Sequence, residues 1–181
     1  MKNNERMIQF FDIGLAGKTH ARDINHALVS PRTINEIMNE LTAIKAENKA
    51  RKKVSPRGTQ EYRLQDICEH DDYWILLVNV VDTTAANPVT QKVGGAESDR
   101  EIIELGDDKG LESSSHLIIY KEQNNAQKHL VLFEKNLSLP FKKAASFLNH
   151  LLKVAARHFA DRYIRPHPSG IEGKTINLGS I

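Results

Sequence analysis

The spacing of apolar residues changes along the chain, and each change predicts a different element of secondary structure. Residues 7–15 (MIQFFDIGL) form an apolar run that Gly14 and Gly17 end, which predicts a first strand. Ser30 and Pro31 then form a typical helix start. After them, apolar residues recur on one helical face at Ile34, Ile37, Met38, Leu41 and Ile44. We therefore expect a strand followed by an amphipathic helix of about four turns.

Two pairs of apolar segments, each joined by a short polar stretch, predict two hairpins. Residues 61–68 (EYRLQDIC) alternate between apolar and polar, and residues 73–82 (YWILLVNVVD) are almost continuously apolar after a polar turn. The continuous run predicts a central strand buried on both faces. Residues 116–120 (HLIIY) and 129–134 (HLVLFE) predict the second hairpin.

A second amphipathic helix is expected to follow the second hairpin, opening at Ser138. Its apolar face is predicted at Phe141, Ala145, Leu148, Leu152, Ala155 and Phe159. Between the hairpins, residues 83–115 are rich in small and acidic side chains and predict a loop of about thirty residues. These elements predict an α+β fold: a mostly antiparallel sheet of about five strands with two amphipathic helices packed on one face.

Composition is consistent with one ordinary globular domain. The 181 residues are 40% hydrophobic and 27% charged, and we expect residues 1–163 to form a single α+β domain. Residues 164–181 are rich in proline and glycine, so we expect a tail or the start of a further element, and the chain can be the N-terminal part of a longer protein. The start MKNNERMIQFF resembles neither a signal peptide nor a membrane span, so we expect a cytoplasmic protein. Cys68 is the only cysteine, which excludes an intramolecular disulfide and predicts a buried thiol.

The net charge of +2 hides an uneven distribution along the chain. Residues 45–63 carry seven basic and two acidic side chains, residues 64–122 carry four and thirteen, and residues 123–181 carry nine and three. Such blocks steer an anionic partner to one surface or hold two copies of the chain together. The charge pattern alone leaves both alternatives open.

The basic segment 45–63 is the main candidate site. Its cations are Lys45, Lys49, Arg51, Lys52, Lys53, Arg57 and Arg63. Such a density of cations neutralises several phosphates of a nucleic acid, although cations also suit the C-terminal end of a helix. A second group could extend the same surface: Lys142, Lys143, Lys153, Arg157, Arg162 and Arg165. Tyr62 is the only aromatic residue near the first group, which favours contact with the backbone over base stacking.

Other motifs have better structural explanations. Arg162 and His167 match the Arg-x4-His spacing of HEPN ribonucleases, but Pro166 breaks the helix that this motif requires. Residues 107–109 (DDK) form an Asp-x-Lys triplet that resembles part of a metal-dependent nuclease core, but they lie in a glycine-flanked loop. Residues 69–72 (EHDD) are best explained as an acidic turn. We therefore predict no catalytic residue, no metal site and no cofactor.

The order of elements also resembles a known group of proteins. Residues 7–155, from MIQFFDIGL through YWILLVNVVD and GDDKGLESSSHLIIY to HLVLFEKN and FLNHLL, are similar in pattern to the N-terminal part of RexA-like phage-exclusion proteins and to KwaB-type phage-defence proteins. The resemblance implies a dimeric, DNA-associating, non-enzymatic sensor that acts with a membrane partner. It includes no diagnostic catalytic motif, and such proteins continue beyond the position of Ile181.

These observations lead to one hypothesis and two alternatives. The hypothesis is a non-enzymatic, sequence-tolerant nucleic-acid-binding protein of phage defence or exclusion, with DNA preferred over RNA and a homodimer as the assembly. The first alternative is a protein-interaction or dimerisation module that uses the acidic loop 97–112. The second is a nuclease effector that uses Asp107, or Arg162 with His167.

Overall fold

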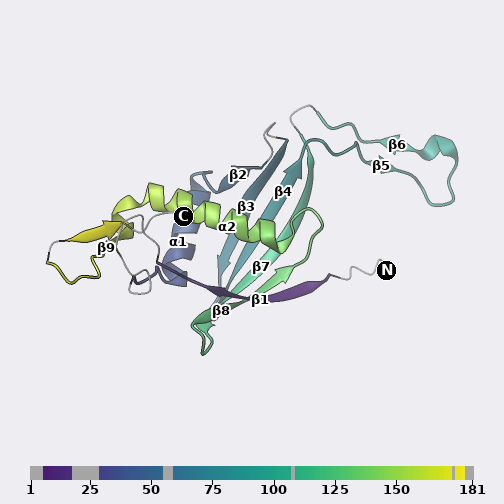
Figure 1. Cartoon of the computed structure of the whole chain (residues 1–181). Coiled ribbons are helices and arrows are strands. Elements are labelled where there is room, and N and C mark those ends of the chain that lie inside the picture. The colour runs from purple at the N-terminus through teal and green to yellow at the C-terminus, as the bar shows by residue number, and fades with distance from the viewer. Residues whose placement is uncertain (1–5, 18–28, 55–58, 107–108, 173, 178–181) are drawn as a thin grey trace.

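A computed structural model describes residues 6–17, 29–54, 59–106, 109–172 and 174–177. The main sheet contains β1 (Ile8–Gly14), β2 (Arg51–Lys53), β3 (Gln60–Glu69), β4 (Tyr73–Asp82), β7 (Leu111–Gln123) and β8 (Lys128–Glu134). The two α-helices are α1 (Ile34–Ala46) and α2 (Phe141–His158). The α+β class that the sequence predicts is confirmed (Figure 1).

The main sheet is antiparallel throughout and has the strand order β1-β8-β7-β4-β3-β2. It therefore has six strands instead of about five. The additional strand is β2, which belongs to the part of the basic segment 45–63 that precedes the predicted strand 61–68, and the sequence predicts no strand there. The β2 backbone pairs with β3, and the preceding Ala50 is 3% exposed, so tertiary packing orders a segment that has little apolar character of its own.

Both helices cover the same face of the sheet, which we call the helix face (Figure 1). On β4 this face carries Trp74, Leu76, Val78 and Val80, all of them buried. Trp74 donates its indole N–H to Asn35 of α1 at 3.0 Å, and Tyr62 of β3 packs edge-on against Phe147 of α2. The hydrophobic core therefore lies between the helix layer and this face.

The other face of β4 differs from the prediction. Ile75, Leu77 and Val81 alternate with the core residues, and each is only partly buried. Among the described residues no helix packs on this side, so β4 is a central strand that is buried on one face. An apolar run of ten residues favours a strand that is covered on both faces. Here the second face has no helix over it, and neighbouring side chains on that face partly shield its apolar residues from solvent instead.

Both helix starts differ from the sequence prediction in detail. Helix α1 begins after Thr33, not after Ser30, because Thr33 and Glu36 form a capping box in which the Thr33 hydroxyl accepts from the Glu36 amide at 3.3 Å. Helix α2 begins after Pro140, and its buried stripe is Ala144, Phe147, Leu151 and Ala155. Ala145, expected on the buried face, instead lines a groove beside β2.

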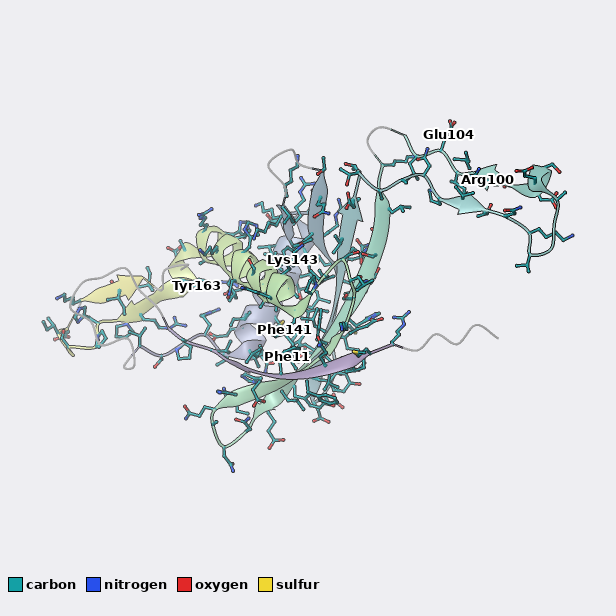
Figure 2. All side chains as sticks on the ribbon, turned by 45° about the vertical axis from the view of Figure 1, so that its right-hand side comes forward. Phe11, Arg100, Glu104, Phe141, Lys143 and Tyr163 are labelled. Carbon is teal, nitrogen blue, oxygen red and sulfur yellow. The ribbon has the colours of Figure 1, made fainter. Side chains whose placement is uncertain are left out.

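Two ribbons extend from this body (Figure 2). The strands β5 (Val89–Thr90) and β6 (Glu101–Ile102) form an arm that projects from the β4–β7 end of the sheet, with the short helix η2 (Glu97–Asp99) at its far part (Figure 1). At the opposite end, η3 (Ala160–Tyr163) leads into β9 (Ile164–Pro166), which pairs with β10 (Thr175–Asn177). The expected loop 83–115 is thus partly a ribbon, and β7 begins before its end.

None of the helices in the described part of the chain is both long and apolar enough to cross a membrane.

Candidate nucleic-acid interface

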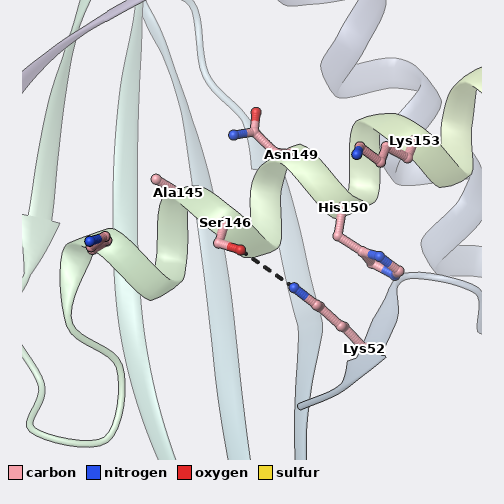
Figure 3. Close-up of a pocket in the computed structure, with 7 residues that line it drawn as sticks. Lys52, Ala145, Ser146, Asn149, His150 and Lys153 are labelled. Atoms are coloured by element: carbon pink, nitrogen blue, oxygen red, sulfur yellow. Dashed lines mark hydrogen bonds between the residues drawn. The ribbon is translucent and has the colours of Figure 1, made fainter. Parts of the chain in front are cut away.

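A groove of about 470 Å³ lies between helix α2 and the edge strand β2 (Figure 3). Its β2 side is Lys52, and its other lining residues all come from α2: Lys142, Ala145, Ser146, Asn149, His150 and Lys153. None of these residues is acidic. Three lysines from two elements that are far apart in the sequence therefore converge on one concave surface.

The alternation of β2 places Lys52 in the groove. Lys52 pairs across the sheet with Tyr62, whose ring lies in the core, so the side chain of Lys52 is on the helix face. Its Nζ lies 3.4 Å from the Ser146 hydroxyl, as the dashed line in Figure 3 shows. This weak contact holds the lysine beside α2 without neutralising its charge.

The helical period of α2 places the other lysines. Lys142, Ser146, Asn149 and Lys153 follow one another at spacings of four, three and four, so they lie along one face of the helix. From Lys142 to Lys153 the helix rises about 16 Å. The whole of α2 contains no Asp or Glu, and Lys143 and Arg157 add to its positive charge.

The start of α2 is also unusual in its charge. Lys142 and Lys143 occupy the first turn, which contains no acidic residue and has no side-chain cap. Cations at this end oppose the helix dipole, with a cost of about 0.3–1 kcal/mol each. An anion bound in the groove would offset this cost. Solubility alone does not require lysines at this particular end of the helix.

His150 contributes a neutral imidazole to the groove. Burial has the largest effect and lowers the pKa of His150. The hydrogen bond with the Arg51 carbonyl opposes it, and the charges of Lys52, Arg157 and Lys153 lower the pKa further, so the net shift is downward. Nε2 of His150 lies 3.2 Å from that carbonyl oxygen, so Nε2 carries the proton and donates. The imidazole thus joins α2 to the backbone of β2.

The seven cations of the basic segment do not form one surface. Lys45 pairs with Asp66 at 2.7 Å, Lys49 with Glu47 at 2.5 Å and Arg63 with Glu61 at 2.9 Å. Within β2, Arg51 and Lys53 point to the side opposite Lys52. Arg57 lies outside the described residues. Of the six cations that the structure describes, only Lys52 lines the groove.

A structural explanation exists for the exposed cations of β2. Because β2 is an edge strand, the charges of Arg51 and Lys53 discourage another chain from pairing with this edge. Lys52 points away from these residues into the groove, so edge protection does not explain it. The sequence grouped these three residues, and the strand separates them.

Sequence reasoning noted Lys142 and Lys153 as an extension of the basic segment but missed Ser146, Asn149 and His150. The absence of acidic residues throughout α2 was a signal that could have identified this helix as the main basic element. Tyr62, considered for base stacking, is 2% exposed and packs on Phe147, so no base can stack on it.

The other candidate chemistry is not brought together. The Arg162 guanidinium lies over the Phe159 ring at 4.5 Å, whereas Nδ1 of His167 contacts the Ser169 hydroxyl at 2.6 Å. Asp107 lies outside the described residues. In the described ranges, no group of three or more His, Cys, Asp or Glu side chains is placed to hold a metal ion. The Cys68 thiol is exposed, so the prediction that it is buried is wrong.

Comparisons with known proteins found no matching family model, no matching curated protein and no matching solved structure.

Proposed function

We propose that this chain binds nucleic acid through the sugar-phosphate backbone, in the groove between α2 and β2. The observation that carries the proposal is the convergence of Lys52, Lys142 and Lys153 on a groove with no carboxylate among its described lining residues. Three cations with no opposing charge attract a polyanion and release its counterions when it binds.

The dimensions of the groove support a strand of nucleic acid as the ligand. Lys142 and Lys153 are about 16 Å apart along α2, and one strand of a duplex presents a phosphate every 3.4 Å or so, which makes about five phosphates over this span. Ser146 and Asn149 lie between the two lysines and supply neutral hydrogen-bonding groups for phosphate oxygens. A small anion would use only one end of such a groove.

The chemistry of the groove also supports binding that is tolerant of sequence and involves no catalysis. Its described lining contains no Phe, Tyr or Trp to stack on a base and no carboxylate to hold a metal ion, and its one imidazole, His150, is turned with Nε2 toward the Arg51 carbonyl. DNA is the preferred ligand in this proposal, and phage defence or exclusion is the proposed setting. Both rest on the resemblance to RexA-like and KwaB-type proteins.

Charge reversal in the groove tests the proposal. We expect Lys52→Glu with Lys153→Glu to abolish binding of a labelled DNA duplex in a gel-shift titration at low salt. A matched control, Lys92→Glu with Lys128→Glu, makes the same change in net charge at exposed sites outside the groove and should retain most of the binding. Equal losses in both variants would show a nonspecific effect of net charge, and wild-type affinity in the groove variant would refute the site.

The choice of nucleic acid is tested in the same titration. Single-stranded DNA, duplex DNA and duplex RNA of equal length are compared with the wild-type protein. Contacts to the backbone predict affinities that change little with base sequence, and the proposed preference predicts tighter binding of DNA than of RNA. Binding of RNA alone would contradict the preference for DNA while leaving the groove as the binding site.

A further inference from the structure

The face of the sheet opposite the helices carries a continuous apolar row, and we call this side the open face. The register between strands places five residues in one line across β1, β8, β7, β4 and β3: Phe10, Leu132, Ile118, Ile75 and Cys68. Neighbouring strands are about 4.8 Å apart, so the register places each residue of the row directly beside the next.

Further apolar and aromatic side chains border this row. Ile8 and Leu77 lie on one side of it, and Leu130, Tyr73 and Tyr120 lie on the other. The Tyr73 and Tyr120 rings are 5.8 Å apart. Phe10 is 68% exposed, Ile8 is 45% exposed and Leu130 is 37% exposed. No described residue of the chain packs over these side chains as the helices do over the helix face.

The polar residues of the open face lie around this apolar centre. The part of the face nearer the arm carries Asn79, Arg63 and Glu112, and Asn79 donates to Glu112 at 2.6 Å. Near β1, Glu134 pairs with Arg6 and with His116. The face therefore has an apolar centre and a rim that carries both signs of charge, which is the usual anatomy of a protein–protein interface.

The size of the open face is suited to a stable dimer. Five strands make it about 24 Å wide, and the stretch from Tyr73 to Val81 makes it about 27 Å long, for a projected area of roughly 650 Å². Side chains that stand on the sheet add to this area, which approaches the roughly 800 Å² that each partner buries in a standard interface. The apolar centre takes up part of this area, and a contiguous apolar patch of a few hundred Å² on a protein surface often marks an interaction site.

The charges favour a second copy of this chain as the occupant. On this face the carboxylates Asp12, Glu112 and Glu134 are mixed with the cations Arg51, Lys53 and Arg63, so it offers a nucleic acid or an anionic membrane surface no uniformly positive area. A second copy offers an equal apolar row together with both signs of charge at its rim, so the same patch is complementary to itself. Two such sheets pack face to face at about 10 Å.

We propose that two copies of the chain pair through their open faces, and that the dimer holds two segments of nucleic acid on its two outer sides. The second part rests on the proposed function of the groove. Because Lys52 and α2 lie on the helix face, pairing of the open faces directs the two grooves away from each other. The dimer is then bivalent and can bridge two duplexes.

The dimer is tested without nucleic acid, by light scattering over a range of protein concentrations. We expect the mass of two chains for the wild type and the mass of one chain for Phe10→Glu, because a charge then lies in the apolar row. Val93→Glu is the matched control, since Val93 is fully exposed on the arm and away from the open face. Circular dichroism checks that both variants fold. A wild-type mass of one chain, or an unchanged mass for folded Phe10→Glu, overturns the dimer.

Salt and thiol labelling separate this interface from one held by the acidic arm. Apolar contacts persist when salt is added, whereas contacts between charges are screened. The Cys68 thiol lies at the end of the apolar row, so its labelling by a thiol reagent should slow as the wild-type concentration rises and stay fast in Phe10→Glu. A dimer that dissociates in salt, or labelling that does not depend on concentration, would refute the open face as the contact.

Bridging is tested by capture of a labelled duplex on beads that carry a second duplex. We expect capture with the wild type, loss of capture with Phe10→Glu even though this variant still binds one duplex, and loss with the groove variant Lys52→Glu/Lys153→Glu even though it still dimerises. A wild-type dimer that binds DNA without capturing the second duplex overturns bridging. A dimer that binds no DNA refutes the proposed function and the bivalence but leaves the pairing of the open faces standing.

Discussion

Replacing the three groove lysines by glutamine gives the most quantitative test of backbone binding. Glutamine keeps a polar side chain and most of the length of lysine but removes the charge, so Lys52→Gln, Lys142→Gln and Lys153→Gln together leave the groove open and uncharged. None of the three lysines forms an ion pair with another described residue. Their replacement should therefore affect binding far more than folding.

The expected magnitude follows from counterion release. Each phosphate that a cation neutralises on a duplex contributes about −0.9 to the slope of log K against log salt, so three contacts contribute about −2.7. Between about 50 and 200 mM salt, this slope reduces the affinity about 40-fold. The triple variant should lose this part of the slope. We expect any remaining slope to come from Lys143 and Arg157, the other cations of α2.

Fluorescence anisotropy of a labelled duplex at several salt concentrations measures the slope directly. The matched control replaces Lys92, Lys109 and Lys128 by glutamine, which removes three charges at exposed sites outside the groove. Its slope should equal that of the wild type to within about one unit. A groove variant with the wild-type slope would show that these lysines do not contact phosphate, whatever its affinity at one salt concentration.

Two further predictions concern stability. The Tyr163 hydroxyl donates to the buried Glu40 carboxylate at 2.7 Å, so Tyr163→Phe should lower the free energy of unfolding by about 1.5–3 kcal/mol in urea titrations, and a loss below 0.5 kcal/mol would contradict this role. Burial alone would raise the pKa of Glu134, but hydrogen bonds from His116 and the charge of Arg6 outweigh it and lower this pKa below its usual value. A carboxyl group whose pKa is lowered by folding stabilises the fold at pH values above its unfolded pKa of about 4.3, and this stabilisation is lost as the pH falls. Glu134→Gln should therefore lower the free energy of unfolding at pH 7 and lower it much less near pH 3. Equal losses at both pH values would exclude this linkage.

The strands of the sheet were largely predictable because their patterns are strong. The predicted run 73–82 has the bounds of β4, and 129–134 covers all of β8 but its first residue. The pairing of the strands and the covering of each sheet face by helices were not predictable to the same extent. The sequence of β4 does not show that only Trp74 and its alternating neighbours meet helices, because an apolar residue on the open face has the same character as one in the core.

The sequence did not predict strand β2 for a different reason. Its three residues are all basic, and they form a strand because β3 offers an edge and Ala50 anchors the turn before it. No local propensity predicts this pairing. The Thr33–Glu36 capping box was visible in the sequence, but Ser30 and Pro31 gave a competing signal three residues earlier, and the structure follows the capping box.

The same strand explains why charge density along the sequence was only a partial guide to the binding surface. Seven cations within nineteen residues suggested one surface, but a strand sends alternate side chains to opposite faces, and ion pairs already hold Lys45, Lys49 and Arg63. A helix concentrates charge more effectively, because residues spaced by three and four lie on one face. The groove arises where the single inward lysine of β2 meets the lysines of α2, which the sequence places ninety residues later or more. The basic groove and the apolar row therefore lie on opposite sides of one sheet, and this separation is what the two proposals require, with a polyanion on one side and a second copy on the other.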